Sequence, residues 1–169
     1  MYVSRYVKNK NIEFLLNLFN ETKLNDIHLV MVCGGLPKKI KIKFMNNSNI
    51  TIFDEIINPV TINKLFYCCD LFVYPSSIGL SLNQALYWGL PAIVGDTRNH
   101  GPEITYLRHQ KNGWLIPIKE QLFIKRILKL HNDKKLLKRM SNFAKKSIIT
   151  SADIEKMVKG FLNCTKSLN

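Results

Sequence analysis

Apolar runs and amphipathic stripes alternate along the first two thirds of the chain. The apolar runs predict strands at residues 2–4, 27–33, 50–53, 71–74, 92–94 and 114–116. Between them, apolar residues recur every three or four positions, as at Ile12, Leu15 and Phe19, and predict helices. Runs rich in branched residues are typical of strands buried on both faces of a parallel sheet. The alternation therefore predicts an α/β fold, a Rossmann-like three-layer sandwich with a mainly parallel sheet of about six strands.

The last third of the chain has a wholly helical pattern. Three apolar stripes follow one another from Leu122 onward, centred near Ile127, Met140 and Phe161. Their spacing is that of ordinary amphipathic helices, so we expect all three stripes to face the core. Residues 38–49 fit either a helix or an extended segment. Because neither a repeat nor a low-complexity linker interrupts the sequence, we expect residues 1–169 to form a single domain with C-terminal helices.

Charged residues and glycines follow the predicted strands, at the edge where an open α/β sheet binds its ligands. They are Arg5 and Lys10 after the first strand, Gly34 and Gly35 after the second, Asp54 and Glu55 after the third, Ser76, Ser77 and Gly79 after the fourth, and Gly95 and Asp96 after the fifth. Cations, backbone N–H groups and a helix N-terminus suit phosphates, whereas carboxylates and amides suit ribose hydroxyls. This edge of the sheet is therefore predicted to bind a nucleoside diphosphate.

Each of these residue types also has a purely structural interpretation. A glycine pair after a strand is usually a turn, and a serine pair before a helix is usually its N-cap. Gln84 fits a plain polar side chain on the following helix, and Glu103 after Pro102 would stabilise a helix start without any ligand. The prediction therefore rests on the joint arrangement and not on any one residue.

Composition and charge limit the classes of binding partner but do not select one of them. The formal net charge of +13 fits either an anionic partner or a lysine-rich composition. The basic helices of the last third fit either a solvent-facing surface or a peripheral contact with an anionic membrane. Basic residues do not interleave with an aromatic stacking platform, which argues against nucleic acid as a partner. The four cysteines form no Cys-x-x-Cys pair, so we expect reduced core thiols and a cytoplasmic protein, with a contact at the inner membrane face left open.

Several common chemistries lack their motifs in this sequence. We find no P-loop, no Gly-x-Gly-x-x-Gly fingerprint and no Gly-x-Ser-x-Gly elbow. The spacing of His28, His100, His109 and His131 gives no metal site, and no metal or other cofactor is expected.

The order of the remaining motifs resembles the C-terminal, donor-binding half of group 1 retaining glycosyltransferases with the GT-B fold. The resemblance extends from Arg5 to about Pro117 and rests on several elements in sequence. They are Ser4-Arg5 with Lys10-Asn11, the glycine turn that ends residues 29–35, the segment from Cys69-Asp70 to Pro75-Ser76, Gly89-Leu90-Pro91, and Glu103 followed by Asn112-Gly113.

The resemblance implies roles for residues at the carboxyl edge. Arg5 and Lys10 would neutralise the diphosphate of a UDP- or GDP-sugar and stabilise the charge on the departing nucleotide. Gly79 and Leu80 would offer backbone N–H groups to it, and Gln84 would contact the ribose. The loop 54–57, which includes Glu55, would flank the base. The further candidate donor-binding residues are Gly34, Ser76, Ser77 and Glu103.

The sequence departs from the broad family at two positions. The family carries two glutamates eight residues apart, where this chain has Ser76 and Gln84. Pro75 to Leu80, Gln84 and the pair Pro102-Glu103 instead resemble a subset that acts in bacterial polysaccharide synthesis. We therefore expect a hexosyltransferase-like enzyme of surface polysaccharide or glycoconjugate synthesis, with an amide at the ribose position.

The resemblance also implies an N-terminal acceptor domain, and we expect residues 1–169 to correspond to the donor-binding half alone. We accordingly expect the chain to bind nucleotide but to transfer little or no sugar by itself. Two alternatives stay open at this point. One is half of a sugar-nucleotide epimerase with the same fold, and the other is a non-catalytic module that binds an anionic ligand.

Overall fold

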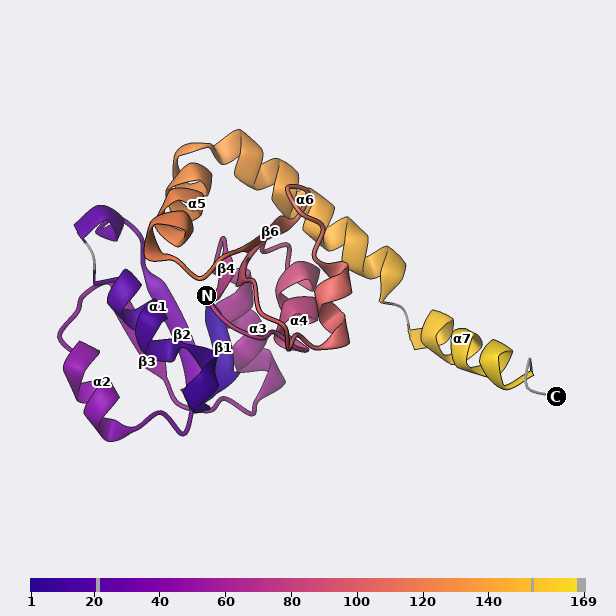
Figure 1. The fold of residues 1–169 in the computed structure, drawn as a ribbon, viewed down its shortest axis with the longest axis horizontal. Helices are drawn as coiled ribbons and strands as arrows, with labels where there is room; N and C mark the ends of the chain where they lie inside the picture. The colour runs from indigo at the N-terminus through magenta and orange to yellow at the C-terminus, as the bar shows by residue number, and fades with distance from the viewer. Residues whose placement is uncertain (21, 153, 167–169) are drawn as a thin grey trace.

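A computed structural model of the chain describes residues 1–20, 22–152 and 154–166. Strands and helices alternate through its first two thirds and helices fill the remainder (Figure 1). In chain order the elements are β1 (Tyr2–Arg5), η1 (Lys8–Lys10), α1 (Ile12–Leu18), η2 (Thr22–Leu24), β2 (Leu29–Gly34), α2 (Lys38–Phe44), β3 (Ile50–Phe53), α3 (Pro59–Tyr67), β4 (Phe72–Tyr74), α4 (Ser81–Tyr87), β5 (Ala92–Gly95), η3 (Pro102–Tyr106), β6 (Gly113–Ile116), α5 (Glu120–Asn132), α6 (Lys134–Ser151) and α7 (Ile154–Lys166).

The strands pair in two parallel groups, β1-β2-β3 and β4-β5-β6. Two backbone hydrogen bonds join the groups between β1 and β4. The amino group of Met1 donates to the Leu71 carbonyl at 2.8 Å, and the Val73 N–H donates to the Met1 carbonyl at 3.0 Å. Met1 thus donates to one residue of the neighbouring strand segment and accepts from the residue two positions further on, which is the hydrogen-bond pattern of parallel strands. The strand order across both groups is therefore β3-β2-β1-β4-β5-β6. The predicted α/β fold with a parallel sheet of about six strands is confirmed.

The order of strands reverses between β1 and β4, because β2 and β3 lie on one side of this pair and β5 and β6 on the other. Side chains reinforce the junction. The rings of Tyr2 and Tyr74 stack with centroids 4.9 Å apart, and the Tyr74 hydroxyl bonds the Ser4 hydroxyl at 3.1 Å. In doubly wound sheets, ligands bind beside such a reversal, outside the carboxyl ends of the strands.

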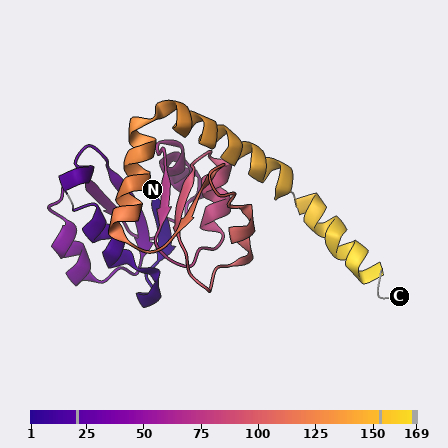
Figure 2. The same ribbon diagram turned by 45° about the horizontal axis from the view of Figure 1, so that its top comes forward.

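Helices from distant parts of the chain meet to form the outer layers (Figures 1 and 2). Phe14 of α1 contacts Phe123 of α5 edge to face at 5.4 Å. Asn63 of α3 accepts hydrogen bonds through Oδ1 from Gln84 Nε2 and Trp88 Nε1, both at 3.1 Å, which ties α3 to α4. These contacts bury apolar side chains of the strands between two helical layers, as the predicted sandwich requires.

Local sequence explains where α4 begins and ends. The helix starts at Ser81 after Leu80, whose side chain makes no capping bond, so Ser76 and Ser77 do not form the N-cap that a serine pair suggests. At its other end, Gly89 takes a left-handed conformation with φ of 79°, and the Leu90 N–H bonds the Ala85 carbonyl. Glycine adopts this conformation without steric cost, so Gly89 ends the helix.

The Asn112-Gly113 motif stabilises the turn before β6. Asn112 is completely buried, and its amide group makes three hydrogen bonds. Its Oδ1 accepts from the Arg108 N–H, while Nδ2 donates to the Tyr106 carbonyl and to the Ser147 hydroxyl of α6. A buried amide must satisfy its polar atoms, so this motif fixes the turn against α6 rather than facing a ligand.

Two expectations from the sequence need correction. The third apolar stripe does not face the core: Ile154, Val158 and Phe161 of α7 are 70%, 50% and 72% exposed, because α7 extends away from the sandwich (Figures 1 and 2). The cysteines are also not all core residues, since Cys33 is buried but Cys68 and Cys164 are exposed. The ambiguous segment 38–49 contains the helix α2.

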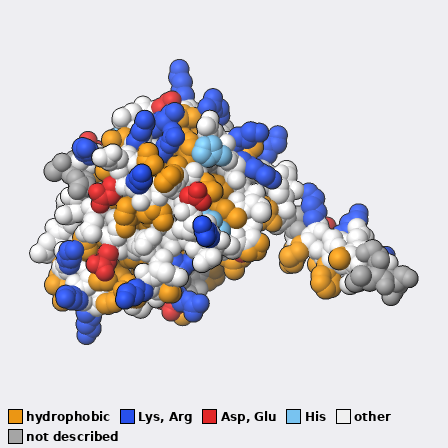
Figure 3. Space-filling view, in the orientation of Figure 1, with side chains coloured by type: hydrophobic (Ala, Val, Ile, Leu, Met, Phe, Trp, Pro, Cys, Tyr) orange, Lys and Arg blue, Asp and Glu red, His pale blue; other side chains and the backbone are white. Residues whose placement is uncertain are grey.

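Charge and apolar area separate on the extended α7. Figure 3 shows Lys and Arg along one edge of this segment and apolar side chains along the opposite edge. Within the described residues, none of the helices has the length and apolar character needed to cross a bilayer. Peripheral contact with an anionic membrane stays a prediction.

The exposed stripe predicts unequal effects of one substitution at two phenylalanines. Phe123→Ala removes a ring with no exposed area and should lower the free energy of unfolding by about 3–5 kcal/mol. Phe161→Ala, in the isolated chain, should change it by less than about 0.5 kcal/mol. Urea denaturation of both variants measures the difference. A large loss at Phe161 would mean that α7 packs on the core in solution.

Candidate functional site

A cavity of about 430 Å³ opens beside the carboxyl ends of β1, β2, β3 and β4, and we call it the carboxyl-edge cavity. Six of the predicted site residues line it together: Arg5, Lys10, Gly34, Glu55, Gly79 and Leu80. They come from four different loops or strand ends, separated by up to 75 positions in the sequence (Arg5 to Leu80). The cavity therefore brings two cations and a glycine turn together at the place where the strand order reverses.

Lys10 connects two walls of the cavity. Its Nζ donates to the Ser77 carbonyl at 2.5 Å and lies 5.4 Å from the centre of the Tyr74 ring. An ammonium group has three N–H donors, so this tether leaves donors for a ligand. The carbonyl and the aromatic face hold the Lys10 charge at the cavity.

Two further hydrogen bonds join the β1–α1 loop to the β4–α4 turn. The Ser76 hydroxyl, which is 2% exposed, donates to the Asn9 carbonyl at 2.7 Å. The Asn11 amide donates to the Pro75 carbonyl at 2.9 Å. Asn11 has a φ of 50°, a left-handed conformation that asparagine tolerates better than most residues. The Ser76 hydroxyl thus holds the turn in place and is used by the protein itself.

The turn at Gly79 and Leu80 offers unused backbone donors. Leu80 is 75% exposed, and a Cβ added to Gly79 would meet nothing within 4 Å. Among the hydrogen bonds between described residues, none uses the N–H of Gly79 or of Leu80. Unpaired backbone N–H groups beside Arg5 and Lys10 are suitable donors for an anionic oxygen.

Gly34 and Glu55 form the opposite wall. A Cβ at Gly34 would lie 2.9 Å from the Glu55 Cβ, so glycine is what permits their close approach. Asp54 instead faces Lys41, with which it forms an ion pair. The carboxylate that remains beside the cavity is therefore that of Glu55, a hydrogen-bond acceptor suited to hydroxyl or N–H groups.

The other candidate residues lie outside the lining of this cavity. Ser77 bonds Thr97 through its hydroxyl at 3.0 Å, and Gln84 donates to Asn63. Glu103 is in the first turn of η3, where an acid is stabilising, and its carboxylate lies against Gly101. Their roles toward a ligand stay predictions.

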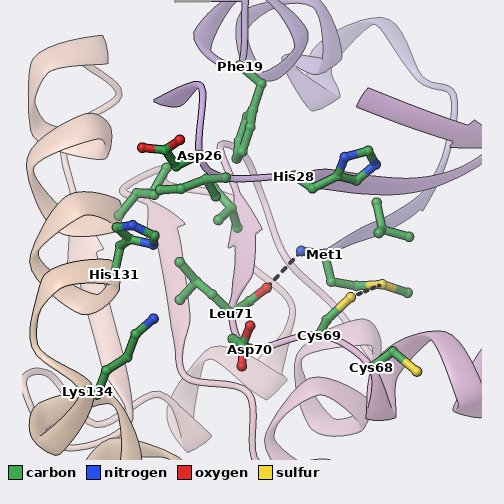
Figure 4. Close-up of a pocket in the computed structure, with 14 residues that line it drawn as sticks. Met1, Phe19, Asp26, His28, Cys68, Cys69, Asp70, Leu71, His131 and Lys134 are labelled. Atoms are coloured by element: carbon green, nitrogen blue, oxygen red, sulfur yellow. Dashed lines mark hydrogen bonds between the residues drawn. The ribbon is translucent and has the colours of Figure 1, made fainter. Parts of the chain in front are cut away.

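A second cavity, of about 390 Å³, lies at the opposite edge of the sheet (Figure 4). It contains the Asp26 and Asp70 carboxylates, with Lys134 as the lysine among its lining residues. Two carboxylates disfavour a diphosphate, whereas the carboxyl-edge cavity has two cations and one carboxylate. Across the described residues, no group of three His, Cys, Asp or Glu side chains is placed to hold a metal ion.

Sequence comparison agrees with the fold. Residues 1–147 match the family described as glycosyl transferases group 1. The chain belongs to this family. No curated protein matches the chain at a significant level. The match covers every loop that lines the carboxyl-edge cavity.

Solved glycosyltransferase structures share this fold. TarM is 22% identical, with a TM-score of 0.79 over 95% of this chain and 33% of its own. The C-terminal domain of the group 1 protein LpcC from Francisella tularensis is 18% identical, with a TM-score of 0.75 over 90% of this chain and 85% of that domain. Pneumococcal GtfA in complex with UDP and GlcNAc is 18% identical, with a TM-score of 0.76 over 98% of this chain and 35% of its own. The chain thus spans about a third of the length of TarM and GtfA.

Sequence reasoning missed the second layer of this site. Asn9 enters through its backbone carbonyl, a contact that no side-chain motif announces. Thr97 and His100 contact the β4–α4 turn from the loop after β5. The available signal was topological, because β5 pairs with β4 and its loop must emerge beside that turn.

The left-handed Asn11 gives a test of this loop architecture. Asn11→Ala and Asn11→Gly both remove the bond to Pro75, but only alanine resists the left-handed conformation. The alanine variant should be less stable than the glycine variant by about 1 kcal/mol. Urea denaturation compares the pair, and equal stabilities would show that residue 11 does not keep a positive φ in solution.

Proposed function

We propose that this chain is the donor-binding domain of a retaining, hexosyltransferase-like enzyme and holds a UDP- or GDP-sugar in the carboxyl-edge cavity. One observation supports this most strongly. Arg5, Lys10 and the Gly79–Leu80 turn, from separate loops, line one cavity beside the β1/β4 reversal. The family membership supports glycosyl transfer as the reaction.

The chemistry of the lining suits a pyrophosphate. A guanidinium, an ammonium and free backbone N–H groups carry positive charge or dipoles toward the same space. When the bond between sugar and diphosphate breaks, negative charge develops on the nucleotide. Donors already fixed around that charge stabilise the transition state more than the bound substrate.

The remaining walls suit the nucleoside. Glu55 and Ile56 lie beside Gly34, at the far end of the cavity from the Gly79 turn, because β1 and β2 separate β3 from β4 across the sheet. An apolar side chain next to a carboxylate suits a base and its N–H or hydroxyl groups. Gln84 would reach the ribose after giving up its bond to Asn63. The UDP complexes of GtfA and of Anabaena HepE, which share this fold, support a uridine nucleotide among the candidates.

A second, acceptor-binding domain is part of the proposal. The chain spans about a third of TarM, and α7 leaves an apolar stripe exposed. Contiguous exposed apolar residues mark surfaces that other protein segments cover. The stripe of Ile154, Val158 and Phe161 is thus suited to docking an acceptor domain, in an enzyme of surface polysaccharide or glycoconjugate synthesis.

Nucleotide binding tests the site directly. Arg5→Ala or Lys10→Met should weaken binding of UDP or GDP about 10- to 100-fold, because each removes a charge-assisted hydrogen bond of about 1.5–3 kcal/mol. Isothermal titration calorimetry at fixed ionic strength measures the effect. Lys138→Met, which removes an exposed charge on α6, should leave the affinity unchanged. If neither nucleotide binds the unmodified chain, or if all three variants weaken binding equally, the site is wrong.

Turnover tests the need for a second domain. The chain alone should bind nucleotide yet release no UDP or GDP from nucleotide sugars above background hydrolysis, because the proposal assigns the acceptor-binding groups to a second domain. A coupled assay for nucleotide release measures this, with a complete two-domain group 1 enzyme as the positive control. Robust release by the isolated chain would show that it carries a complete catalytic site.

A further inference from the structure

His100 lies between the loops that follow β4 and β5. Its Nδ1 accepts the backbone N–H of Ile78 at 3.2 Å, directly before the Gly79–Leu80 turn. Its Nε2 lies 3.4 Å from the Thr97 hydroxyl, which in turn bonds the Ser77 hydroxyl at 3.0 Å. The Gly101 N–H also donates to the Ile78 carbonyl at 2.8 Å. The imidazole and its neighbour therefore hold both peptide groups of Ile78.

A backbone N–H group points at each ring nitrogen of His100. The N–H of Ile78 lies 3.2 Å from Nδ1, and the N–H of Thr97 lies 3.3 Å from Nε2. A neutral imidazole has one lone pair and accepts from one of these two donors at a time, whereas a protonated ring accepts from neither. The neutral ring is therefore the form that can hold the loop after β4 through Ile78.

The surroundings favour the neutral ring. Partial burial lowers the pKa of His100 below its usual 6.5, and Lys10 adds to this effect, while Asp96 and the bond with Gly95 oppose it. Asp96 and Lys10 are the charged groups that act on this ring. Lys10 is also the residue that bonds Ser77, so the same turn is held from two sides.

We propose that neutral His100 is a positioning residue that fixes the Gly79–Leu80 turn in the shape that presents its N–H groups to the diphosphate. This inference rests on the proposed function. His100 does not line the cavity, so it acts through the peptide groups of Ile78 and not by touching the ligand.

Protonation of His100 breaks this arrangement. Nδ1–H and the Ile78 N–H would then be two donors facing each other, and an unpaired donor in a partly buried place is unfavourable. The turn must move, and the affinity for a diphosphate ligand falls with it. Because the folded state favours the neutral ring, the effect is absent above pH 6.5 and grows as the pH falls below it.

A purely electrostatic histidine would give the opposite sign. A cation near the diphosphate strengthens binding as the pH falls. The pH dependence therefore separates a positioning role from a charge-neutralising role.

The experiment measures binding of UDP-glucose and GDP-mannose between about pH 8 and about pH 5. Free UDP has a terminal phosphate that, like other phosphate monoesters, titrates at roughly pH 6. The diphosphate of a nucleotide sugar has no such group, so the pH dependence of binding then reports on the protein. On acidification over this range, the affinity of the unmodified chain should fall about tenfold more than that of His100→Asn, since a lost hydrogen bond is worth about 1.4 kcal/mol. In His100→Asn, the side-chain oxygen takes the place of Nδ1 as an acceptor that does not titrate.

His109→Asn is the matched control, because His109 is an exposed histidine that does not line the cavity. It should keep the pH dependence of the unmodified chain. The proposal is overturned if acidification strengthens binding, or if His100→Asn retains the full pH dependence.

A readout without ligand separates this inference from the proposed function. The amide resonance of Ile78 should shift with a midpoint below pH 6.5 in the unmodified chain and in His109→Asn, and should not titrate in His100→Asn. If Ile78 titrates through His100 but neither nucleotide sugar binds, the proposed function fails while the contact stands. If nucleotide sugars bind and Ile78 does not respond to His100, the positioning role is wrong.

Discussion

The pairing of β1 with β4 is the contact on which the rest of the structure depends. Met1, Leu71 and Val73 form its backbone ladder, and the stacked rings of Tyr2 and Tyr74 close it on one side. This pair joins two parallel groups of strands into the order of a doubly wound sheet. It also sets the loops after β1 and β4 side by side. Without that adjacency, Arg5 and the Gly79 turn would belong to different parts of the molecule.

The site therefore consists of short loops held by polar contacts across the junction. Lys10, Asn11 and Ser76 each make a bond from one loop to the other. These three bonds join partners more than 60 positions apart in sequence, and they end on three consecutive residues, Pro75, Ser76 and Ser77. Some of the groups that shape the candidate site, such as Lys10, thus also hold the fold together. A serine that looks like a ligand-binding residue in the sequence can serve the scaffold, as Ser76 does.

The parts of the fold and the site that the sequence predicts are those that follow from topology. Arg5, Lys10 and Gly79 could be placed together because parallel strands end at one edge, and each residue follows a recognisable apolar run. Contacts such as Ile78 with His100 could not, because they depend on the side-chain packing of loops with no period of their own. The stripe on α7 shows another limit. A periodic pattern states that one face of a helix is apolar, but it does not state what covers that face.

The hydrogen bonds that hold the β4–α4 turn affect the conformational entropy that ligand binding would cost. A loop that becomes ordered only around its ligand loses conformational entropy at that moment, which weakens affinity and slows association. Here Lys10 and Ser76 have already restricted the backbone during folding. The β4–α4 turn is therefore preorganised, and an anion that bound there would meet backbone dipoles that are already fixed. A ligand bound here would therefore cost the turn little further conformational entropy.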